Sequence, residues 1–252
     1  MVMASEKAGL KVGKCPTGIK GFDELIEGGL PRGRTVLVSG SCGTGKTVFS
    51  TQFLYNGIVH YGEPGIYVML EQDAVEFKED MKGFGIDLQK METEGKLIII
   101  NASLRKKGTT NFLELKSETH EISPEMATAE KIMDVIEQAA KRINAKRAVI
   151  DSLSSMTLSF SDAQSLRHLI LDLNYTLKRI GLTTFIISDE IAKDVTESAE
   201  KYVVDGVITL RYVTVGPDPG RTLVIDKMRK TKHSENIHTV RFCKDGLEIL
   251  QE

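Results

Sequence analysis

The amino-acid sequence predicts an α/β fold in which a mostly parallel sheet is covered by helices on both faces and extended by C-terminal antiparallel strands. Two observations lead to this expectation. Up to residue 188, short apolar runs alternate with stretches of helical periodicity, the pattern of the strand–helix–strand units that build parallel sheets. After residue 202, strand-like runs follow one another with only turns between them, which is typical of an antiparallel meander.

The elements of the parallel part follow in order along the chain. Short apolar runs predict buried strands at 35–39, 65–70, 97–100, 147–151 and 183–188. Apolar residues at helical spacing predict helices at 47–60, 74–83, 129–143 and 166–180. Two of these helices carry terminal signals. Ser123 and Pro124 suit the start of the third helix, Ser161 and Gln164 form a capping-box pattern before the fourth, and Gly181 ends it.

The C-terminal quarter and one insertion complete the expected architecture. Strands are predicted at 203–213, 221–228, 238–242 and 247–250. The segment 216–220, GPDPG, reads as a loop between the first two of them. Residues 105–123 are polar, mixed in charge and without periodicity, which favours a surface insertion.

Composition disfavours several classes of function. The formal net charge of the 252 residues is −2, so the overall charge does not indicate binding to nucleic acid or to an anionic membrane. Cys15, Cys42 and Cys243 are far apart, which disfavours a disulfide framework or a zinc site. Apolar runs are too short to span a bilayer, and residues 1–10 contain no apolar signal region. We therefore expect a cytoplasmic protein without membrane partners.

A glycine-rich segment provides the strongest functional motif. Residues 40–47, GSCGTGKT, match G-x-x-x-x-G-K-[ST] between a predicted strand and a predicted helix. Glycines let backbone N–H groups converge on phosphate oxygens, and the helix N-terminus favours negative charge. Lys46 would neutralise the β- and γ-phosphates of a nucleoside triphosphate, and the Thr47 hydroxyl would bind Mg²⁺. The expected nucleotide contacts are Gly40, Ser41, Cys42, Gly43, Thr44, Gly45, Lys46, Thr47 and Val48.

Three polar residues at or after the ends of predicted strands would lie at the same edge of the sheet. Asp151 is expected to hold Mg²⁺, with a turn cap as the alternative. Glu71 could accept a proton from water that attacks the γ-phosphate, but Glu71, Gln72 and Asp73 also precede a helix and could cap it. Ser188 is a candidate sensor of the γ-phosphate, or alternatively a strand-end hydrogen-bond partner.

A basic cluster, KMRKTKH at 227–233, follows one of the C-terminal strands. Such a run is usually a solvated turn. In an oligomeric ATPase, however, cations in this position can reach a neighbouring subunit's phosphates and stabilise transferred charge.

Taken together, these motifs resemble the KaiC-like branch of the RecA superfamily. The resemblance covers nearly the whole chain and is weakest at 105–123 and 189–202. It rests on an ordered set of segments: TGI at 17–19, GFDEL at 21–25, GGLPRG at 28–33, SGSCGTGKT at 39–47, QFLYNGI at 52–58, EPGIYVMLE at 63–71, FGIDL at 84–88, EGKL at 94–97, AVIDS at 148–152 and the basic cluster.

The resemblance implies a RecA-like P-loop NTPase: a single ATPase domain over residues 1–252, of archaeal type. Within it, 1–33 would be a lead-in segment, 34–202 the nucleotide-binding core and 203–252 a C-terminal β segment. Such proteins form rings, usually hexamers, that hold ATP or ADP, with Mg²⁺, between subunits. By this likeness Asp151 is the Mg²⁺-associated acid, and Glu71 is the first of two adjacent catalytic glutamates. The residues that match the segment contacting the neighbour's nucleotide are Lys227, Met228, Arg229, Thr231 and His233, with Lys227 and Arg229 as the cations.

Three departures from the family pattern bear on function. Gln72 stands where many relatives have a second glutamate, which suggests slower or differently tuned hydrolysis. Lys230 replaces the glycine of K-x-R-G. Lys201 and Tyr202 replace the Ser-Thr phosphorylation pair of the clock protein's second repeat, and only one repeat is present. A circadian autokinase is therefore disfavoured, and a regulatory or mechanical ATPase is favoured.

Two other functions remain open on this fold. A recombinase-like protein would bind DNA through loops that include residues 189–201, but these carry five acids against two bases, and phosphate binding prefers the opposite sign. A nucleotide-gated scaffold would use ATP binding more than turnover. The sequence does not identify a protein partner.

Overall fold

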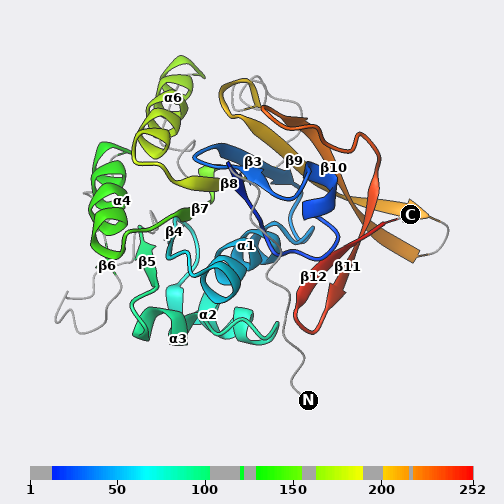
Figure 1. Cartoon of the computed structure of the whole chain (residues 1–252), viewed down its shortest axis with the longest axis horizontal. Coiled ribbons are helices and arrows are strands. Elements are labelled where there is room, and N and C mark those ends of the chain that lie inside the picture. Colours follow the sequence, from blue (N-terminus) through cyan, green and yellow to red (C-terminus); the bar gives the residue numbers. More distant parts are fainter. Residues whose placement is uncertain are drawn as a thin grey trace.

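A ten-stranded sheet forms the centre of the structure (Figure 1), a computed structural model that describes residues 13–102, 120–121, 129–154, 163–189, 201–215 and 218–251. Across the sheet the strand order is β12-β11-β10-β9-β3-β8-β7-β4-β5-β6. The strands are β3 (Thr35–Gly40), β4 (Gly65–Met69), β5 (Leu97–Asn101), β6 (His120–Glu121), β7 (Arg147–Asp151), β8 (Thr183–Asp189), β9 (Gly206–Val215), β10 (Asp218–Met228), β11 (His238–Cys243) and β12 (Gly246–Leu250).

The sheet is parallel from β9 to β6 and continues antiparallel through β10, β11 and β12. This confirms the predicted fold class. One detail differs: the first C-terminal strand, β9, runs parallel to β3, so the antiparallel extension begins only at β10. The chain reverses direction at the β9–β10 hairpin, which places β10 to β12 beyond the parallel part (Figure 1).

Helices cover both faces of the sheet. On one face lie α1 (Lys46–Tyr61), α2 (Ala74–Lys82) and α3 (Leu88–Thr93), and on the other lie α4 (Ala129–Ile143) and α6 (Ala163–Arg179) (Figure 1). Successive strand residues point to opposite faces, so Val36 and Val38 pack with the first group while Leu37 packs with the second. Both faces of the central strands are therefore buried, which explains their unbroken apolar runs.

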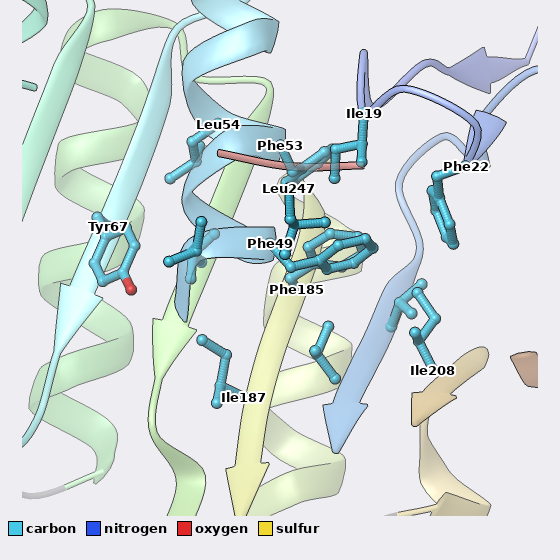
Figure 2. Packing of buried hydrophobic residues seen from close by; sticks show 14 of the residues in the cluster. Ile19, Phe22, Phe49, Phe53, Leu54, Tyr67, Phe185, Ile187, Ile208 and Leu247 are labelled. Atoms are coloured by element: carbon cyan, nitrogen blue, oxygen red, sulfur yellow. The ribbon is translucent and has the colours of Figure 1, made fainter. Parts of the chain in front are cut away.

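An aromatic cluster fixes α1 on the sheet (Figure 2). The Phe49 and Phe53 rings of α1 lie 5.5 and 4.5 Å, centroid to centroid, from the Phe185 ring of β8. Phe22 contacts Phe49 edge-on at 5.1 Å. Since α1 begins at Lys46, this packing also fixes the position of the glycine-rich loop that joins β3 to α1.

The lead-in segment is linked to the core by an ionic network that is buried at its centre. It contains β1 (Lys14–Cys15), the 3-10 helix η1 (Asp23–Ile26) and β2 (Leu30–Pro31), and β1 and β2 form a small antiparallel sheet. Glu63 binds Arg147, which is fully buried, at 2.6 Å and Arg32 at 2.6 Å. These two guanidinium groups hold the pKa of Glu63 below its usual value, although burial opposes them. Within the described residues, no helix has the length and apolar content needed to cross a membrane.

Several predicted boundaries need correction. The strand expected at 203–213 begins only at Gly206, because residues 201–203 are helical and Val203 and Val204 pack into the core. The loop expected at 216–220 is shorter, since β10 already pairs with β9 at Asp218. Helix α3 was not predicted, because its six residues are too few to show periodicity.

Other predictions lie wholly or largely outside the described residues. Most of the expected insertion at 105–123 does, although His120–Glu121 forms the edge strand β6. The helix signals at Ser123, Pro124 and Ser161 also lie outside them.

Candidate functional site

Four parallel strands deliver the predicted site residues to one edge of the sheet. Strand register places Ser39 beside Ser188, Gly40 beside Asp189, and Met69 beside Asp151. Because β3, β4, β7 and β8 all end at this edge, the glycine-rich loop, Glu71, Asp151 and Ser188 are brought together from distant parts of the sequence. This is the carboxyl edge, where open α/β sheets bind ligands. Ser188 is buried at the end of β8.

The loop between β3 and α1 requires glycine at specific positions. Gly45 is the N-cap residue of α1 with a φ of 104°, a left-handed conformation that suits glycine. It provides no side-chain cap, so the first backbone N–H groups of α1 are not covered by an N-cap side chain. A β-carbon on Gly40 would lie 2.3 Å from the carbonyl oxygen of Leu210. The segment thus combines tight packing with the positive end of a helix, a feature that favours phosphate and other anions.

Lys46 is buried and makes three contacts through its ammonium group. It donates to the carbonyl oxygens of Gly40 and Ser41 at 2.8 and 2.9 Å, and it lies 2.8 Å from Asp189 Oδ1. The ammonium is therefore held directly beneath the loop. Thr44, also buried, donates its hydroxyl to the carbonyl oxygen of Ser41 at 2.8 Å and stabilises the same turn.

Asp151 and Thr47 form a pair of oxygen ligands. The Thr47 hydroxyl donates to Asp151 Oδ2 at 3.0 Å, and the Tyr67 hydroxyl donates to the same atom at 2.7 Å. Burial raises the pKa of Asp151, the two hydrogen bonds oppose that rise, and the charges of Glu71 and Asp189 add to it. A carboxylate held in this environment gains from a cation. One hydroxyl and one carboxylate suit Mg²⁺, which usually takes its other ligands from phosphates and water.

Glu71 lies beside Asp151 and is exposed. The Ser152 hydroxyl donates to Glu71 Oε1 at 2.7 Å, which orients the carboxylate at the sheet edge. The cap of α2 is Asp73, which accepts from the backbone N–H groups of Val75 and Glu76 at 2.8 and 3.4 Å. The helix-capping alternative for Glu71 therefore loses its main support.

Two features of this edge were not predicted from the sequence. One is Asp189, which binds Lys46. The other is a stack from the C-terminal strands, in which the guanidinium of Arg221 lies 4.9 Å from the Tyr212 ring centroid and 4.7 Å from that of Phe242. The Tyr212 hydroxyl donates to the carbonyl oxygen of Gly43 at 2.7 Å, so the stack supports the glycine-rich loop.

The predicted basic cluster lies at the opposite edge of the sheet. Met228, buried, pairs with Gly206 on β9, and Gly206 pairs with Val36 near the start of β3. The glycine-rich loop begins at the other end of β3, at Gly40. Along β3, Val36 and Gly40 are four residues apart, which corresponds to about 13 Å at 3.3 Å per residue. The cluster and the loop of one subunit are therefore not brought together.

The side chains of this cluster are held by neighbouring backbone and by one buried acid. Lys227 Nζ donates to the carbonyl oxygens of Lys201 and Val204 at 3.1 and 2.7 Å. Burial lowers the pKa of Lys227, and the charge of Arg229 lowers it further. Arg229 is exposed and lies 4.0 Å from Asp205, while its backbone N–H donates to the Asp205 carbonyl oxygen.

The remaining members of the cluster shape the turn. Thr231 donates to Glu27 Oε2 at 2.9 Å, and His233 Nδ1 lies 3.0 Å from the Ser234 carbonyl oxygen. Lys230 has a φ of 66°, the left-handed region that favours glycine. This explains physically why a glycine fits the family pattern at that position.

In this parallel sheet, one strand runs into a glycine-rich loop and a helix, and a second strand, separated from it by β8, ends in an acid. This is the arrangement of RecA-type P-loop NTPases. Fold and site together place the chain in that class. The family model described as "ATPase: KaiC" matches residues 15–252, so the chain belongs to the KaiC ATPase family.

Individual relatives agree with this assignment. The circadian clock oscillator protein KaiC of Acaryochloris marina is 35% identical over 97% of this chain and 45% of its own length. The same protein of Parasynechococcus marenigrum is 37% identical over 98% and 46%, respectively. The chain thus spans about half the length of these curated relatives. A solved KaiC-like protein of the hyperthermophilic archaeon Pyrococcus horikoshii superposes with a TM-score of 0.80 at 34% identity, covering 94% of this chain and 99% of that one.

The DNA-binding alternative depends on residues 189–201, and residues 190–200 lie outside the described part of the chain. The charge argument against it stays a prediction from the sequence.

Proposed function

We propose that this chain binds ATP with Mg²⁺ and hydrolyses it slowly within a homo-oligomeric ring, expected to be hexameric, whose nucleotide sites are shared between neighbouring subunits. The observation that carries the proposal is the separation of the phosphate loop from Lys227 and Arg229, which lie at opposite edges of one sheet. Cations that are fixed at the far edge do not reach their own subunit's nucleotide site, so in the proposed ring they would act on a neighbour's.

The carboxyl edge would hold the nucleotide. The N–H groups at the start of α1, which have no side-chain cap, and the Lys46 ammonium would bind the phosphates, as in other P-loop proteins. Thr47 and Asp151 would hold Mg²⁺ through the oxygen pair described above. When bound, the ion neutralises charge on the β- and γ-phosphates.

Glu71 would act as the general base for hydrolysis. Its carboxylate is exposed at the sheet edge, is oriented by Ser152 and is not used as the cap of α2. Gln72, where many relatives have a second glutamate, donates to Asp80 at 3.0 Å and brings no second carboxylate. A single base supports the slow turnover that we propose.

Arg229 and Lys227 would complete the neighbouring site. A cation supplied in trans stabilises the charge that spreads as the γ-phosphoryl group leaves, an effect worth roughly 10³–10⁵ in rate in other systems. The ring, its cytoplasmic location, its regulatory or mechanical role, and the division into segments 1–33, 34–202 and 203–252 belong to the same proposal. They rest on the family resemblance.

A mixing experiment tests the shared site. Arg229→Ala and Lys46→Ala proteins should each hydrolyse ATP poorly. In a random equimolar mixture, about a quarter of interfaces should join an intact loop to an intact arginine, and activity should return accordingly. The matched control mixes Arg229→Ala with a Lys46→Ala, Arg229→Ala double variant, where no interface can be intact. If the first mixture stays as inactive as the control although mixed rings form, the shared-site proposal is wrong.

A further inference from the structure

Asp189 occupies an unusual position beside the phosphate loop. It is the last residue of β8 and pairs in register with Gly40, the last residue of β3. Its carboxylate lies 2.8 Å from Lys46 Nζ, and its backbone N–H donates to Ser154 Oγ at 2.9 Å. The Lys46 side chain is only 8% exposed, while that of Asp189 is 39% exposed. The pair therefore joins a buried cation to an acid at the rim of the site.

The ammonium of Lys46 has three N–H donors, and the structure gives it three acceptors. Two are carbonyl oxygens of the loop itself, and the third is the Asp189 carboxylate. A phosphate oxygen that binds Lys46 must take the place of at least one of them. Asp189 is the acceptor that carries a charge and lies outside the loop.

We infer that Asp189 is an intramolecular competitor of the nucleotide phosphates for Lys46, and that it sets the affinity of the site. This inference rests on the proposed function. Displacing Asp189 costs its ion pair with Lys46. The released carboxylate then stands near Asp151, whose pKa it already raises, and near the incoming phosphates. Both effects weaken the binding of any nucleotide whose phosphates reach Lys46.

Nucleotide selectivity follows from the same geometry. Lysine in a P-loop reaches the β- and γ-phosphates, so Asp189 should weaken the binding of ATP and ADP. AMP has neither phosphate, and its affinity should be independent of Asp189. The competition therefore reduces the ratio of ATP affinity to AMP affinity at this site.

Equilibrium titration calorimetry of the full chain with Mg²⁺ and ATP tests the inference through Asp189→Asn. The amide removes the charge but keeps the shape of the side chain. We expect ATP to bind roughly two- to fivefold tighter, the effect of losing one ion pair whose acid is partly exposed, with AMP affinity unchanged. Asp189→Glu, which keeps the charge, should bind ATP close to the wild-type affinity. The control is Asp172→Asn on the exposed side of α6, which changes net charge equally and far from the loop.

Each outcome separates the inference from the proposed function. If wild-type protein binds no ATP, the proposed function fails. If wild-type protein binds ATP but Asp189→Asn binds it equally or more weakly, Asp189 is not a competitor and only the inference fails. An equal increase in ATP affinity in Asp189→Asn and Asp172→Asn would also overturn the inference, because net charge alone would explain the change. The melting temperature without nucleotide shows whether each variant is folded.

Discussion

The carboxyl edge of the central sheet, where the parallel strands end, and the opposite edge, where they begin, have opposite arrangements of charge. At the carboxyl edge, one lysine, Lys46, pairs with Asp189, and two further acids, Asp151 and Glu71, lie at the same edge. At the opposite edge, one buried acid, Asp205, is surrounded by cations: Lys178 at 2.6 Å, Arg34 at 3.5 Å and Arg229 at 4.0 Å. Among these residues, the acids outnumber the cation at the first edge, and the cations outnumber the acid at the second.

In the proposed ring, this difference between the two edges would favour head-to-tail contact between subunits. Complementary charges favour contact between unlike edges of two copies and oppose contact between like edges. A head-to-tail contact that closes produces a ring. Under the proposed function the edges also differ in role, because the acids at the carboxyl edge would lie around bound phosphates, while Asp205 is paired with cations of its own subunit. The following variants test that contrast.

Glu71→Gln should give the largest effect. We expect nucleotide binding to persist while turnover falls by roughly 10²–10⁴-fold, the usual range for the loss of a general base. Single-turnover kinetics and calorimetry on the same samples separate the two quantities. Glu76→Gln, an exposed acid in the first turn of α2, is the matched control and should change neither. Unchanged turnover in Glu71→Gln would assign proton transfer to a different group.

Lys46→Ala should weaken ATP binding by roughly 10²–10³-fold, because it removes the charge that faces the phosphates. Calorimetric titration measures the loss. Lys82→Ala, at the exposed end of α2, makes the same charge change away from the loop and should bind normally. Wild-type affinity in Lys46→Ala would show that the nucleotide site lies elsewhere.

Asp205→Asn should lower the stability of the fold without changing nucleotide binding at the subunit's own glycine-rich loop. Removing one buried acid leaves its cations uncompensated, and we expect a loss of about 2–3 kcal/mol in the free energy of unfolding, less than for a fully buried pair because Lys178 and Arg34 are each partly exposed. Urea denaturation measures it, with Asp172→Asn as the control. Turnover should also fall in rings, since Asp205 helps to hold Arg229. If neither stability nor turnover changes, Asp205 does not stabilise the fold and does not hold Arg229 in place.

Lys230→Gly should have the smallest effect. The left-handed conformation at this residue costs about 1–2 kcal/mol for a side chain with a β-carbon, and the greater freedom of glycine in the unfolded state offsets part of the gain. We expect a net stabilisation of about 0.5 kcal/mol, seen as a rise of about 1–2 °C in melting temperature. Lys232→Gly, whose backbone is not left-handed, should not be stabilised. Equal shifts in the two variants would contradict the conformational explanation.

Elements with strong periodicity were predictable from the sequence, and so were residues within a local motif. The glycine-rich loop, the strand ending at Asp151 and the helices over both faces are examples. Asp189 was not predicted as a site residue, because an acid after a strand is common and its meaning depends on pairing with Gly40, 149 positions away. Asp205 depends in the same way on contacts with Arg34 and Lys178, which are distant in the sequence. The stack of Arg221 on Tyr212 depends on the register of the β9–β10 hairpin, which composition and periodicity do not specify.

The packing of the C-terminal strand β12 against α1 has an evolutionary consequence. Gly246 has a φ of 108°, and a β-carbon there would lie 2.3 Å from the amide carbon of Gln52, whose amide binds the backbone of Asp245 and Leu247. Neither residue can change freely while the other stays. In an alignment of relatives, positions 52 and 246 should therefore vary together, and a lineage that loses the glycine should also carry a smaller side chain at position 52.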